Sequence, residues 1–290
     1  MTPLALTVVV ACAVAWSGFD WARKTLVERI SPTPLMLLLT AGQAPLFAAW
    51  AAFDGAPAVG GGYWPPAVGS VALNVVANLA FIHAFRVAPI SLTIPLLSLT
   101  PVVTALLAVP LLGELPTWRQ GAGILLVVGG TFLLNLRHGE ASVAGLARSL
   151  VREPGVRLML VVVLCWSLTP PLDKLAMDHA SPAAHGFVLC AGVAVVVAAL
   201  LLAQGRVGEV RQVARAPAVY LLAIGVSVAG LALQLVAYRL VYVAFVETFK
   251  RGLGNAMALV YGRFLFAERV GVAQVTAVAL MAIGVTLILV

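Results

Sequence analysis

The sequence predicts an all-α membrane protein with ten transmembrane helices, arranged as two inverted five-helix repeats. Of its 290 residues, 62% are hydrophobic and 10% are charged, and the mean hydropathy is +1.06. A soluble domain carries about 25% charged residues, so a soluble globular fold is excluded. The apolar residues form segments of membrane-spanning length, and the second half of the chain repeats residues of the first.

Each apolar segment has roughly the 20 residues that a helix needs to cross a bilayer. The first five are expected at 3–22, 33–53, 66–87, 90–112 and 117–136. The last five are expected at 157–173, 183–203, 217–237, 241–264 and 270–290. The long polar stretch between the two sets divides the chain into a first repeat at 1–136, a linker at 137–156 and a second repeat at 157–290.

The two halves share residues at matched positions. A shift of 150 positions aligns Trp16-Ser17 with Trp166-Ser167, Lys24 with Lys174, and Ser31-Pro32 with Ser181-Pro182. Because each half has an odd number of spans, the two copies must lie in opposite orientations. Inverted repeats are typical of secondary transporters, whose substrate site lies near the membrane midplane where the repeats meet. The recurrence also indicates that the first segment is a transmembrane helix rather than a signal peptide.

The ninth segment is apolar but contains Glu247, Lys250 and Arg251. A charge near the bilayer centre costs on the order of 3 kcal/mol, so such residues usually face a bundle interior or a wet cavity. The spacings i, i+3 and i, i+4 allow all three to lie on one helix face and partly neutralise one another. An ion pair that locks the helix to a neighbour is one interpretation. We favour a polar site at mid-membrane depth, to which Asn255 also contributes.

The fourth segment, which corresponds to the ninth in the repeat, contains Pro95 and Pro101. Hydroxyl residues surround these prolines: Thr93, Ser98 and Thr100. Proline removes a backbone hydrogen bond, so we expect this helix to be kinked or locally open. Interrupted segments at matching positions of two repeats indicate a binding site, although bending for packing is the simpler alternative.

Lys and Arg gather in the loops that follow odd-numbered segments. The positive-inside rule places these loops in the cytoplasm and both termini outside. We expect a multi-pass protein of the cell (inner) membrane. The three cysteines, Cys12, Cys165 and Cys190, lie in apolar runs and indicate neither a disulfide framework nor a zinc site. We expect no metal and no cofactor.

The pattern resembles the drug/metabolite transporter superfamily, in its EamA-type branch, over essentially the whole chain. The resemblance rests on the repeated Trp-Ser, Lys and Ser-Pro, and on Leu112-Gly113-Glu114 and Phe266-Ala267-Glu268 at the ends of the fourth and ninth segments. Lys250-Arg251 also looks like a motif of the ninth helix in a subset of this family. The resemblance implies a transporter, with amino-acid and metabolite exporters among its relatives. Members are often drawn with cytoplasmic termini, opposite to the charge count here.

Several charged residues lie at the ends of the predicted helices. Lys24 and Lys174 would bind an anionic group at matching mouths of the two repeats, or would extend to lipid phosphates. Asp20 beside Arg23 and Lys24, and Asp173 beside Lys174, are expected to form charge pairs at the mouths. Glu114 and Glu268 end their helices and are interpreted as loop or packing determinants rather than ligands.

Aromatic and amide residues complete the set of candidate substrate ligands. Trp16 and Trp166 would stack on a substrate, or would serve packing and interface anchoring. Further candidates lie on the third and eighth segments: Asn74, Asn78, His83, Gln234 and Tyr238. Hydrogen bonding between helices is an equally open role for these residues. The other histidines, His138, His179 and His185, are near loops and lack metal-ligand spacing.

These observations favour a secondary transporter that moves a small polar metabolite, such as an amino acid or organic anion, by alternating access. Lys250 and Arg251 would attract a carboxylate or phosphate, while Glu247 would balance their charge or titrate, with His83 and Asp20 as second choices for a coupling acid. The sequence has no GxxxxGK[ST] loop for ATP and no nucleic-acid-binding motif.

A membrane-embedded lipid or prenyl-transfer enzyme is the alternative from another class. It is disfavoured by the lack of a DDxxD-like run or a GxSxG motif. A non-transporting scaffold or channel subunit remains a third reading. The expected partners are a small-molecule substrate and the lipid bilayer, and the frequent Gly and Ala leave a homodimer open.

Overall fold

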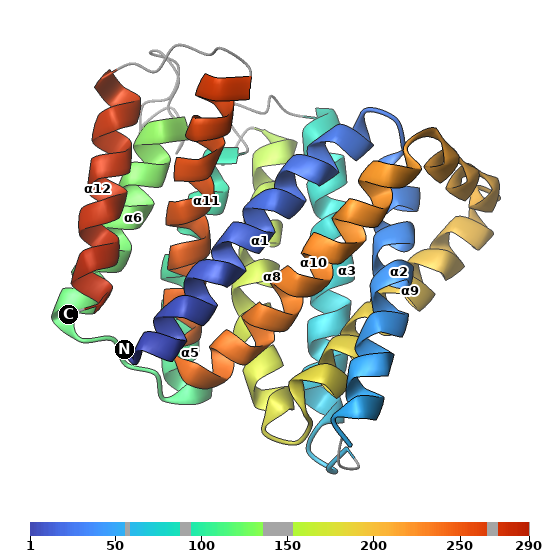
Figure 1. Ribbon diagram of the computed structural model, residues 1–290, viewed down its shortest axis with the longest axis horizontal. Coiled ribbons are helices and arrows are strands. Elements are labelled where there is room, and N and C mark those ends of the chain that lie inside the picture. Colours follow the sequence, from blue (N-terminus) through green and yellow to red (C-terminus); the bar gives the residue numbers. More distant parts are fainter. Residues whose placement is uncertain (56–58, 88–93, 136–152, 266–271, 290) are drawn as a thin grey trace.

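The computed structural model describes residues 1–55, 59–87, 94–135, 153–265 and 272–289, and this part of the chain is helical with no strand (Figure 1). Before the linker the helices are α1 (Pro3–Val27), α2 (Pro32–Phe53), α3 (Trp64–Val87), the 3₁₀ helix η1 (Ile94–Leu99), α5 (Thr100–Leu112) and α6 (Trp118–Asn135). After the linker they are α8 (Pro154–Met177), α9 (Pro182–Ala203), the 3₁₀ helix η2 (Val207–Arg215), α10 (Pro217–Leu240), α11 (Val243–Leu265) and α12 (Val272–Leu289).

The starts of many helices follow from local sequence. A proline opens five of them: Pro3, Pro32, Pro154, Pro182 and Pro217. Proline suits this position because its φ angle is already helical and the first N–H groups of a helix lack internal partners. The hydroxyl groups of Thr2 and Ser181 accept hydrogen bonds from the amides of Ala5 and Ala184, which caps α1 and α9.

Six helices of the described chain are long and apolar enough to cross a membrane, and two shorter apolar helices accompany them. The six are α1, α2, α8, α9, α10 and the Trp64–Phe81 part of α3; the shorter pair are Leu96–Leu112 and Gln274–Leu289. Large apolar side chains on the outside of the bundle are exposed, including Leu106, Val195 and Leu221. So much exposed apolar surface indicates a lipid-facing exterior.

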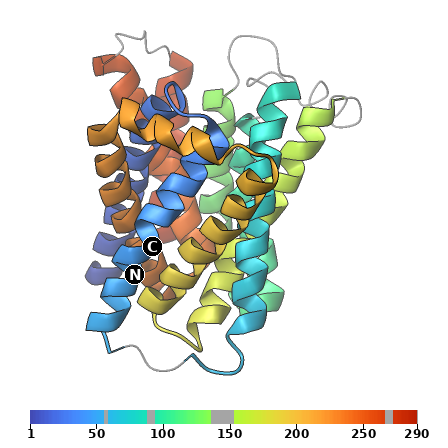
Figure 2. The ribbon, with the colours of Figure 1, turned by 90° about the vertical axis from the view of Figure 1, so that its right-hand side faces the viewer.

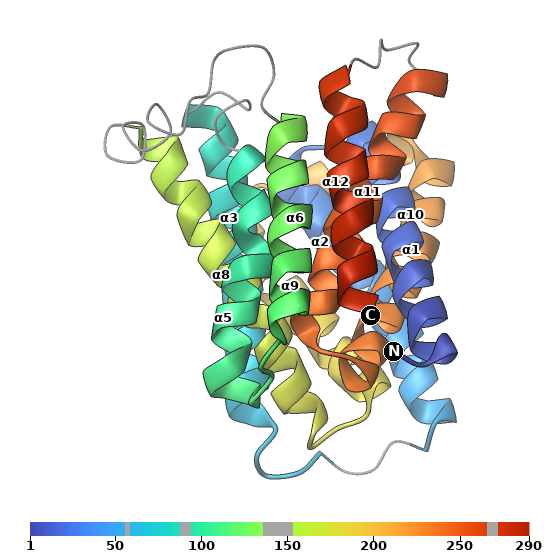
Figure 3. The ribbon, with the colours of Figure 1, turned by 90° about the vertical axis from the view of Figure 1, so that its left-hand side faces the viewer.

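Helices from the two halves of the chain pack against each other in pairs (Figures 2 and 3). The main partners are α1 with α10, α3 with α8, α2 with α9, and α6 with α12. The last pair approaches very closely, because a Cβ atom on Gly284 would lie 2.6 Å from the carbonyl oxygen of Gly123. The N-terminus of α1 and the C-terminal end of α12 lie at the same end of the bundle (Figures 1 and 3).

The fourth segment is interrupted, as its prolines predict. The chain runs as a 3₁₀ helix to Leu99 and then continues as α5, which has Pro101 in its first turn and ends at Gly113 with φ +68°. The hydroxyl group of Ser167 in α8 donates to the carbonyl oxygen of Thr100 at 3.2 Å. A neighbouring helix therefore supplies a hydrogen bond at the break. Thr93 lies outside the described residues.

The helix ends are close to those expected, with one clear departure. The end predicted for the first segment at residue 22 is wrong, because α1 continues to Val27. Lys24 therefore lies in the last turn of α1, and Lys174 likewise lies in the last turn of α8. The run from 217 to 264 divides between Leu240 and Val243. Most of the linker at 137–156 lies outside the described residues.

Candidate functional site

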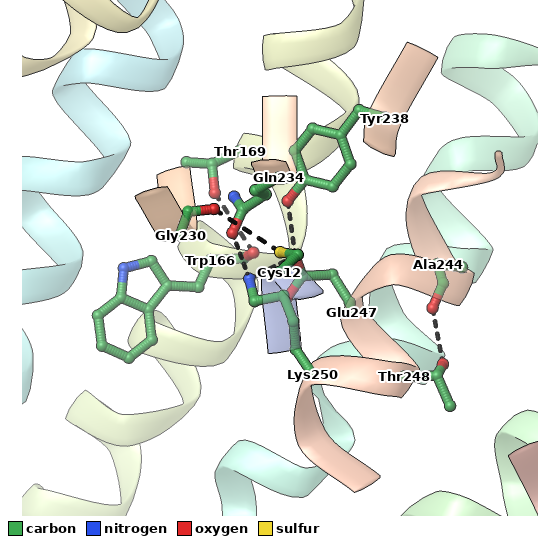
Figure 4. Close-up of polar contacts among 10 residues, drawn as sticks. All are labelled: Cys12, Trp166, Thr169, Gly230, Gln234, Tyr238, Ala244, Glu247, Thr248 and Lys250. Atoms are coloured by element: carbon green, nitrogen blue, oxygen red, sulfur yellow. Dashed lines mark hydrogen bonds and ion pairs between the residues drawn. The ribbon is translucent and has the colours of Figure 1, made fainter. Parts of the chain in front are cut away.

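Lys250 is the centre of a polar cluster between α1, α10 and α11 (Figure 4). Its Nζ atom lies 2.8 Å from Glu247 Oε1 and 2.6 Å from Gln234 Oε1. The Tyr238 hydroxyl group donates to the same Glu247 oxygen at 2.6 Å. The Lys250 Nζ atom also lies 5.2 Å from the centre of the Trp16 ring, within the range of a cation–π interaction. The structure thus gathers five of the predicted site residues in one place.

Helical spacing explains how these side chains converge. Gln234 and Tyr238 are one turn apart on α10, while Glu247 and Lys250 are separated by three residues on α11, so each pair occupies one face of its helix. Because an ammonium group has only donors, the oxygen of the Gln234 amide must face Lys250. Glu247, Tyr238 and Gln234 are buried, and 19% of the Lys250 side chain is exposed. In this cluster the positive charge of Lys250 is balanced by the negative charge of Glu247, inside the helix bundle.

Trp16 brings an unused donor to this cluster. Its indole Nε1 atom is buried and has no hydrogen-bond partner among the described residues. The indole edge faces the backbone of α10 at Gly230, where a Cβ atom would lie 3.4 Å from Nε1. Buried indole N–H groups usually find an acceptor. The Trp16 ring therefore contacts Lys250, and its buried N–H group has no acceptor in the part of the chain that the structure describes.

Arg251, the third charged residue of this part of α11, behaves differently. Glu247 forms its ion pair with Lys250 rather than with Arg251. Arg251 is half-buried. Asn255, one turn further along α11, donates to the hydroxyl group of Thr131 in α6 at 3.2 Å. Asn255 therefore bonds to a neighbouring helix rather than to the Lys250 cluster.

A second ion pair lies at the start of α11. Lys174 Nζ is 2.6 Å from Glu114 Oε1 and 3.2 Å from the carbonyl oxygen of Val241. The second carboxylate oxygen of Glu114 accepts the backbone N–H of Val243 at 2.8 Å. Glu114 thus joins the end of α5 to α8 and α11, in agreement with its interpretation as a packing determinant. The pair lines an open pocket of about 520 Å³, together with Asp178 and Tyr242.

This pocket does not coincide with the Lys250 cluster. Glu247 follows Val243 by four residues, so the two are separated by one turn of α11, a rise of about 6 Å. We base the candidate site on the Lys250 cluster, because its geometry combines buried charges with an unused donor. The pocket at Lys174 lies one turn away, toward the end of the bundle.

The expected charge pair between Asp173 and Lys174 is wrong. Lys174 turns to Glu114, whereas Asp173 is buried and accepts a short hydrogen bond from Ser70 of α3. The Asp173 Oδ1 atom is also 3.1 Å from His185 Nε2 of α9. Consecutive residues on a helix are about 100° apart, so Asp173 and Lys174 face different neighbours. The expected pair of Asp20 with Arg23 is present at 2.9 Å and is exposed.

The remaining candidates do not join the Lys250 cluster. The side-chain amides of Asn74 and Asn78 donate to backbone carbonyl groups of their own helix, at 3.1 and 2.8 Å. Trp166 packs against Phe81, with ring centres 5.3 Å apart. The side chains of Lys24 and His83 are exposed, so His83 does not fit the expected role of a buried coupling acid.

Sequence reasoning missed the group around His185, which it placed near a loop. His185 is fully buried in α9 and contacts both Asp173 and Tyr63. The sequence did contain an indication of this group, because His185 is an ionisable residue within a segment that is otherwise apolar. Elsewhere, no group of three or more His, Cys, Asp or Glu residues capable of holding a metal ion occurs among the described residues.

Comparisons with known proteins agree with this architecture. The family model described as the EamA-like transporter family matches residues 3–136 and 153–290. No curated protein matches the chain. Among solved structures, 28 chains match. One of them, described only as a crystal structure of a protein, is 16% identical over 99% of this chain and 96% of that chain, with a TM-score of 0.75.

A structural likeness at 16% identity shows a shared fold alone. The family model shows the family as well, because it covers both halves of the chain. It confirms the resemblance inferred from the repeated motifs. Proteins of that family are transporters rather than enzymes. The chain therefore belongs to the EamA-like transporter family, and it is a multi-pass membrane transporter of the drug/metabolite transporter superfamily.

Proposed function

We propose that the protein is a secondary transporter, acting as an exporter, of a small polar metabolite that carries a carboxylate, such as an amino acid or organic anion. It works by alternating access between two inverted five-helix repeats in the cell (inner) membrane. The observation that carries the proposal is the partly buried Lys250, bound by Glu247 and Gln234 beneath Trp16, whose own N–H group has no partner among the described residues.

The helix packing supports the inverted repeats. Exchanging each helix with its counterpart in the other half leaves the pattern of pairs unchanged. The pair α1–α10 becomes α8–α3, and the pairs α2–α9 and α6–α12 each remain the same pair. The helices α1 and α8, which open the two repeats, run in opposite directions along the bundle (Figures 1 and 3). Such an arrangement lets one repeat rock against the other around a site between them.

The chemistry of the cluster favours a carboxylate. Lys250 supplies a cation, and the indole N–H of Trp16 supplies a neutral donor beside it. Charge-assisted hydrogen bonds to a carboxylate are about twice as strong as neutral ones. An incoming carboxylate would replace Glu247 as the partner of Lys250, while the hydrogen bond from Tyr238 keeps Glu247 in place.

The resident Glu247 makes this exchange reversible. A buried lysine with no counter-ion would bind an anion strongly and release it slowly, because an unpaired buried charge is costly. Glu247 returns to Lys250 when the cargo leaves, so both the loaded and the empty site are electrically compensated. Protonation of Glu247 would weaken its hold on Lys250 and favour loading.

A ligand-induced thermal-shift screen tests the proposal on purified protein. The compounds are the twenty L-amino acids and a set of small organic acids, each compared with its decarboxylated analogue. A ligand at a hundred times its dissociation constant stabilises a protein by ~2.7 kcal/mol, which is readily detected. We expect stabilisation by one class of carboxylate and none by the analogues.

Lys250→Met keeps the length of the side chain and removes its charge, and it should abolish the stabilisation. Arg211→Met, which removes an exposed cation from η2, serves as the matched control and should leave the stabilisation intact. Stabilisation that persists in Lys250→Met would reject this site. Stabilisation by the decarboxylated analogues would reject a carboxylate as the feature that is recognised.

A further inference from the structure

A second polar group lies buried between α3, α8 and α9, apart from the Lys250 cluster. Asp173 Oδ1 accepts a hydrogen bond from the Ser70 hydroxyl group and lies 3.1 Å from His185 Nε2. The other ring nitrogen of His185, Nδ1, lies 3.1 Å from the Tyr63 hydroxyl group. Tyr63, Ser70 and His185 have no exposed surface, and Asp173 is 3% exposed. We call these four residues the His185 relay.

Among the described residues, His185 is the group that can become a cation in contact with Asp173. Lys174, its neighbour on α8, is bonded to Glu114. The helices α2 and α9 carry no Lys, Arg, Asp or Glu, and Arg239 of α10 is exposed. The titratable groups that face the relay from the packed elements are Tyr63 and, from α10, Tyr238. Further groups near this end of the bundle, Asp178 and His179, are exposed.

The geometry accommodates two protonation states of His185. In the neutral state, Nε2–H donates to Asp173 and Nδ1 accepts the hydrogen bond from Tyr63. In the charged state, both ring nitrogens donate, and the Tyr63 oxygen becomes the acceptor. The heavy atoms need not move between these states, because a hydroxyl group donates or accepts by rotation of its hydrogen. Each state satisfies both ring nitrogens.

The two states differ in net charge. With neutral His185, the relay carries the charge of Asp173 inside the bundle; with charged His185, the relay is neutral. Burial opposes an uncompensated charge and therefore favours uptake of a proton, whereas the cost of burying two ions opposes it. Histidine is suited to this exchange because its ordinary titration lies near physiological pH.

Tyr63 lies next to an exposed turn at one end of the bundle. It directly precedes α3 and follows Gly61 and Gly62, which are exposed. The turn around these glycines lies against the α8–α9 turn, since the Gly60 amide donates to the carbonyl oxygen of His179 at 3.0 Å. The Tyr63 hydroxyl group is the partner of His185 Nδ1, so a proton that enters from this end of the bundle would reach the ring through Tyr63.

We infer that the His185 relay is a reversible proton-binding site and the carrier of the coupling proton in this transporter. The bound proton comes from water and forms an N–H bond at His185 Nδ1, with Asp173 balancing the charge. Tyr238 bonds to Glu247 in the Lys250 cluster, and its helix, α10, also packs against α8, which carries Asp173. The role in coupling rests on the proposed function, whereas the binding of the proton does not.

Proton binding is tested by ¹⁵N NMR of the full chain in lipid nanodiscs, with ¹⁵N-labelled histidine. The chain has 4 histidines, so His185→Gln assigns the signals of His185 directly. We expect these signals to change from the neutral to the charged pattern as the pH is lowered from 8 to 5. In Asp173→Asn, which removes the balancing charge, the change should move to lower pH. The exposed His179 should be unaffected by that substitution.

A single protonation state of His185 across this range, or an unchanged titration in Asp173→Asn, would overturn the inference. Either result would mean that the four residues form a fixed set of hydrogen bonds that serves packing. The NMR experiment requires no cargo, so it decides the proton site whether or not the proposed function holds.

Coupling is tested in proteoliposomes loaded with an equimolar mixture of the twenty L-amino acids. For the wild type, an imposed pH gradient should accelerate the efflux of amino acids. For His185→Gln, the rate of efflux should be the same with and without the gradient. Acceleration that survives in His185→Gln would overturn the coupling role. If the wild type moves none of the mixture, transport of amino acids fails as a function, while the titration of His185 still decides the proton site.

Discussion

The ion pair between Glu114 and Lys174 gives a sharp quantitative prediction. Glu114 is 5% exposed and holds both the Lys174 ammonium group and the Val243 amide. Breaking a buried ion pair by removing one partner costs about 3–5 kcal/mol, because the other charge is left uncompensated. The Lys174 side chain is 24% exposed, so partial hydration reduces the loss. We expect Glu114→Gln to lower the free energy of unfolding by about 3 kcal/mol.

The assay is equilibrium unfolding in mixed detergent micelles, followed by tryptophan fluorescence. Lys174→Met should cost a similar amount, and the double variant should lose about 2 kcal/mol less than the sum of the two single variants, because it leaves no unpaired charge. Asp20→Asn is the matched control. It breaks the exposed pair with Arg23, which is worth at most about 1 kcal/mol.

Two results would refute this reasoning. A loss below about 1 kcal/mol for Glu114→Gln would mean that water compensates Lys174 fully. Additive losses in the double variant would mean that the pair has no mutual stabilisation, and that each residue acts through other contacts.

Three further predictions follow from local geometry. Gly284→Ala should destabilise the protein, because its Cβ atom would lie 2.6 Å from a backbone oxygen of α6, whereas Gly129→Ala meets open space and should not; thermal unfolding compares them. Maleimide should label none of the buried cysteines until the protein is unfolded: Cys12, Cys165 and Cys190. Hydrogen bonds from Arg206 hold the pKa of Glu209 below its usual range, so their contribution to stability is present above the ordinary carboxyl pKa and is lost as the pH falls through the lowered value. ¹³C NMR should therefore show Glu209 titrating below the range of a free glutamate, and Arg206→Gln should move the titration back toward that range.

The helical elements were predictable because their signals are local. Apolar segments of spanning length, each bounded by polar residues and often opened by a proline, predicted most helix ends within four residues. The prolines likewise predicted the break that the structure shows between η1 and α5. The repeated motifs led to the family that the family model then confirmed.

The candidate site was predictable only in part. Charges inside an apolar helix identified Glu247 and Lys250, because burying a charge without a role or a partner is unfavourable. Spacing placed Gln234 and Tyr238 on one face of α10, but it could not show that this face meets α11. The shared position of Trp16 and Trp166 in the repeat suggested equal roles, yet Trp16 contacts Lys250 and Trp166 packs on Phe81.

The sequence by itself determined the class of protein, the helical segments and the family, because hydropathy, helix length and repeated motifs depend on residues close together in the chain. Only the tertiary structure decided which charges meet. Asp173 and Lys174 are neighbours in sequence, but a rotation of about 100° along α8 directs one to His185 and the other to Glu114. Partner choice inside a bundle depends on which helix faces are in contact, and that is set by packing across the whole chain.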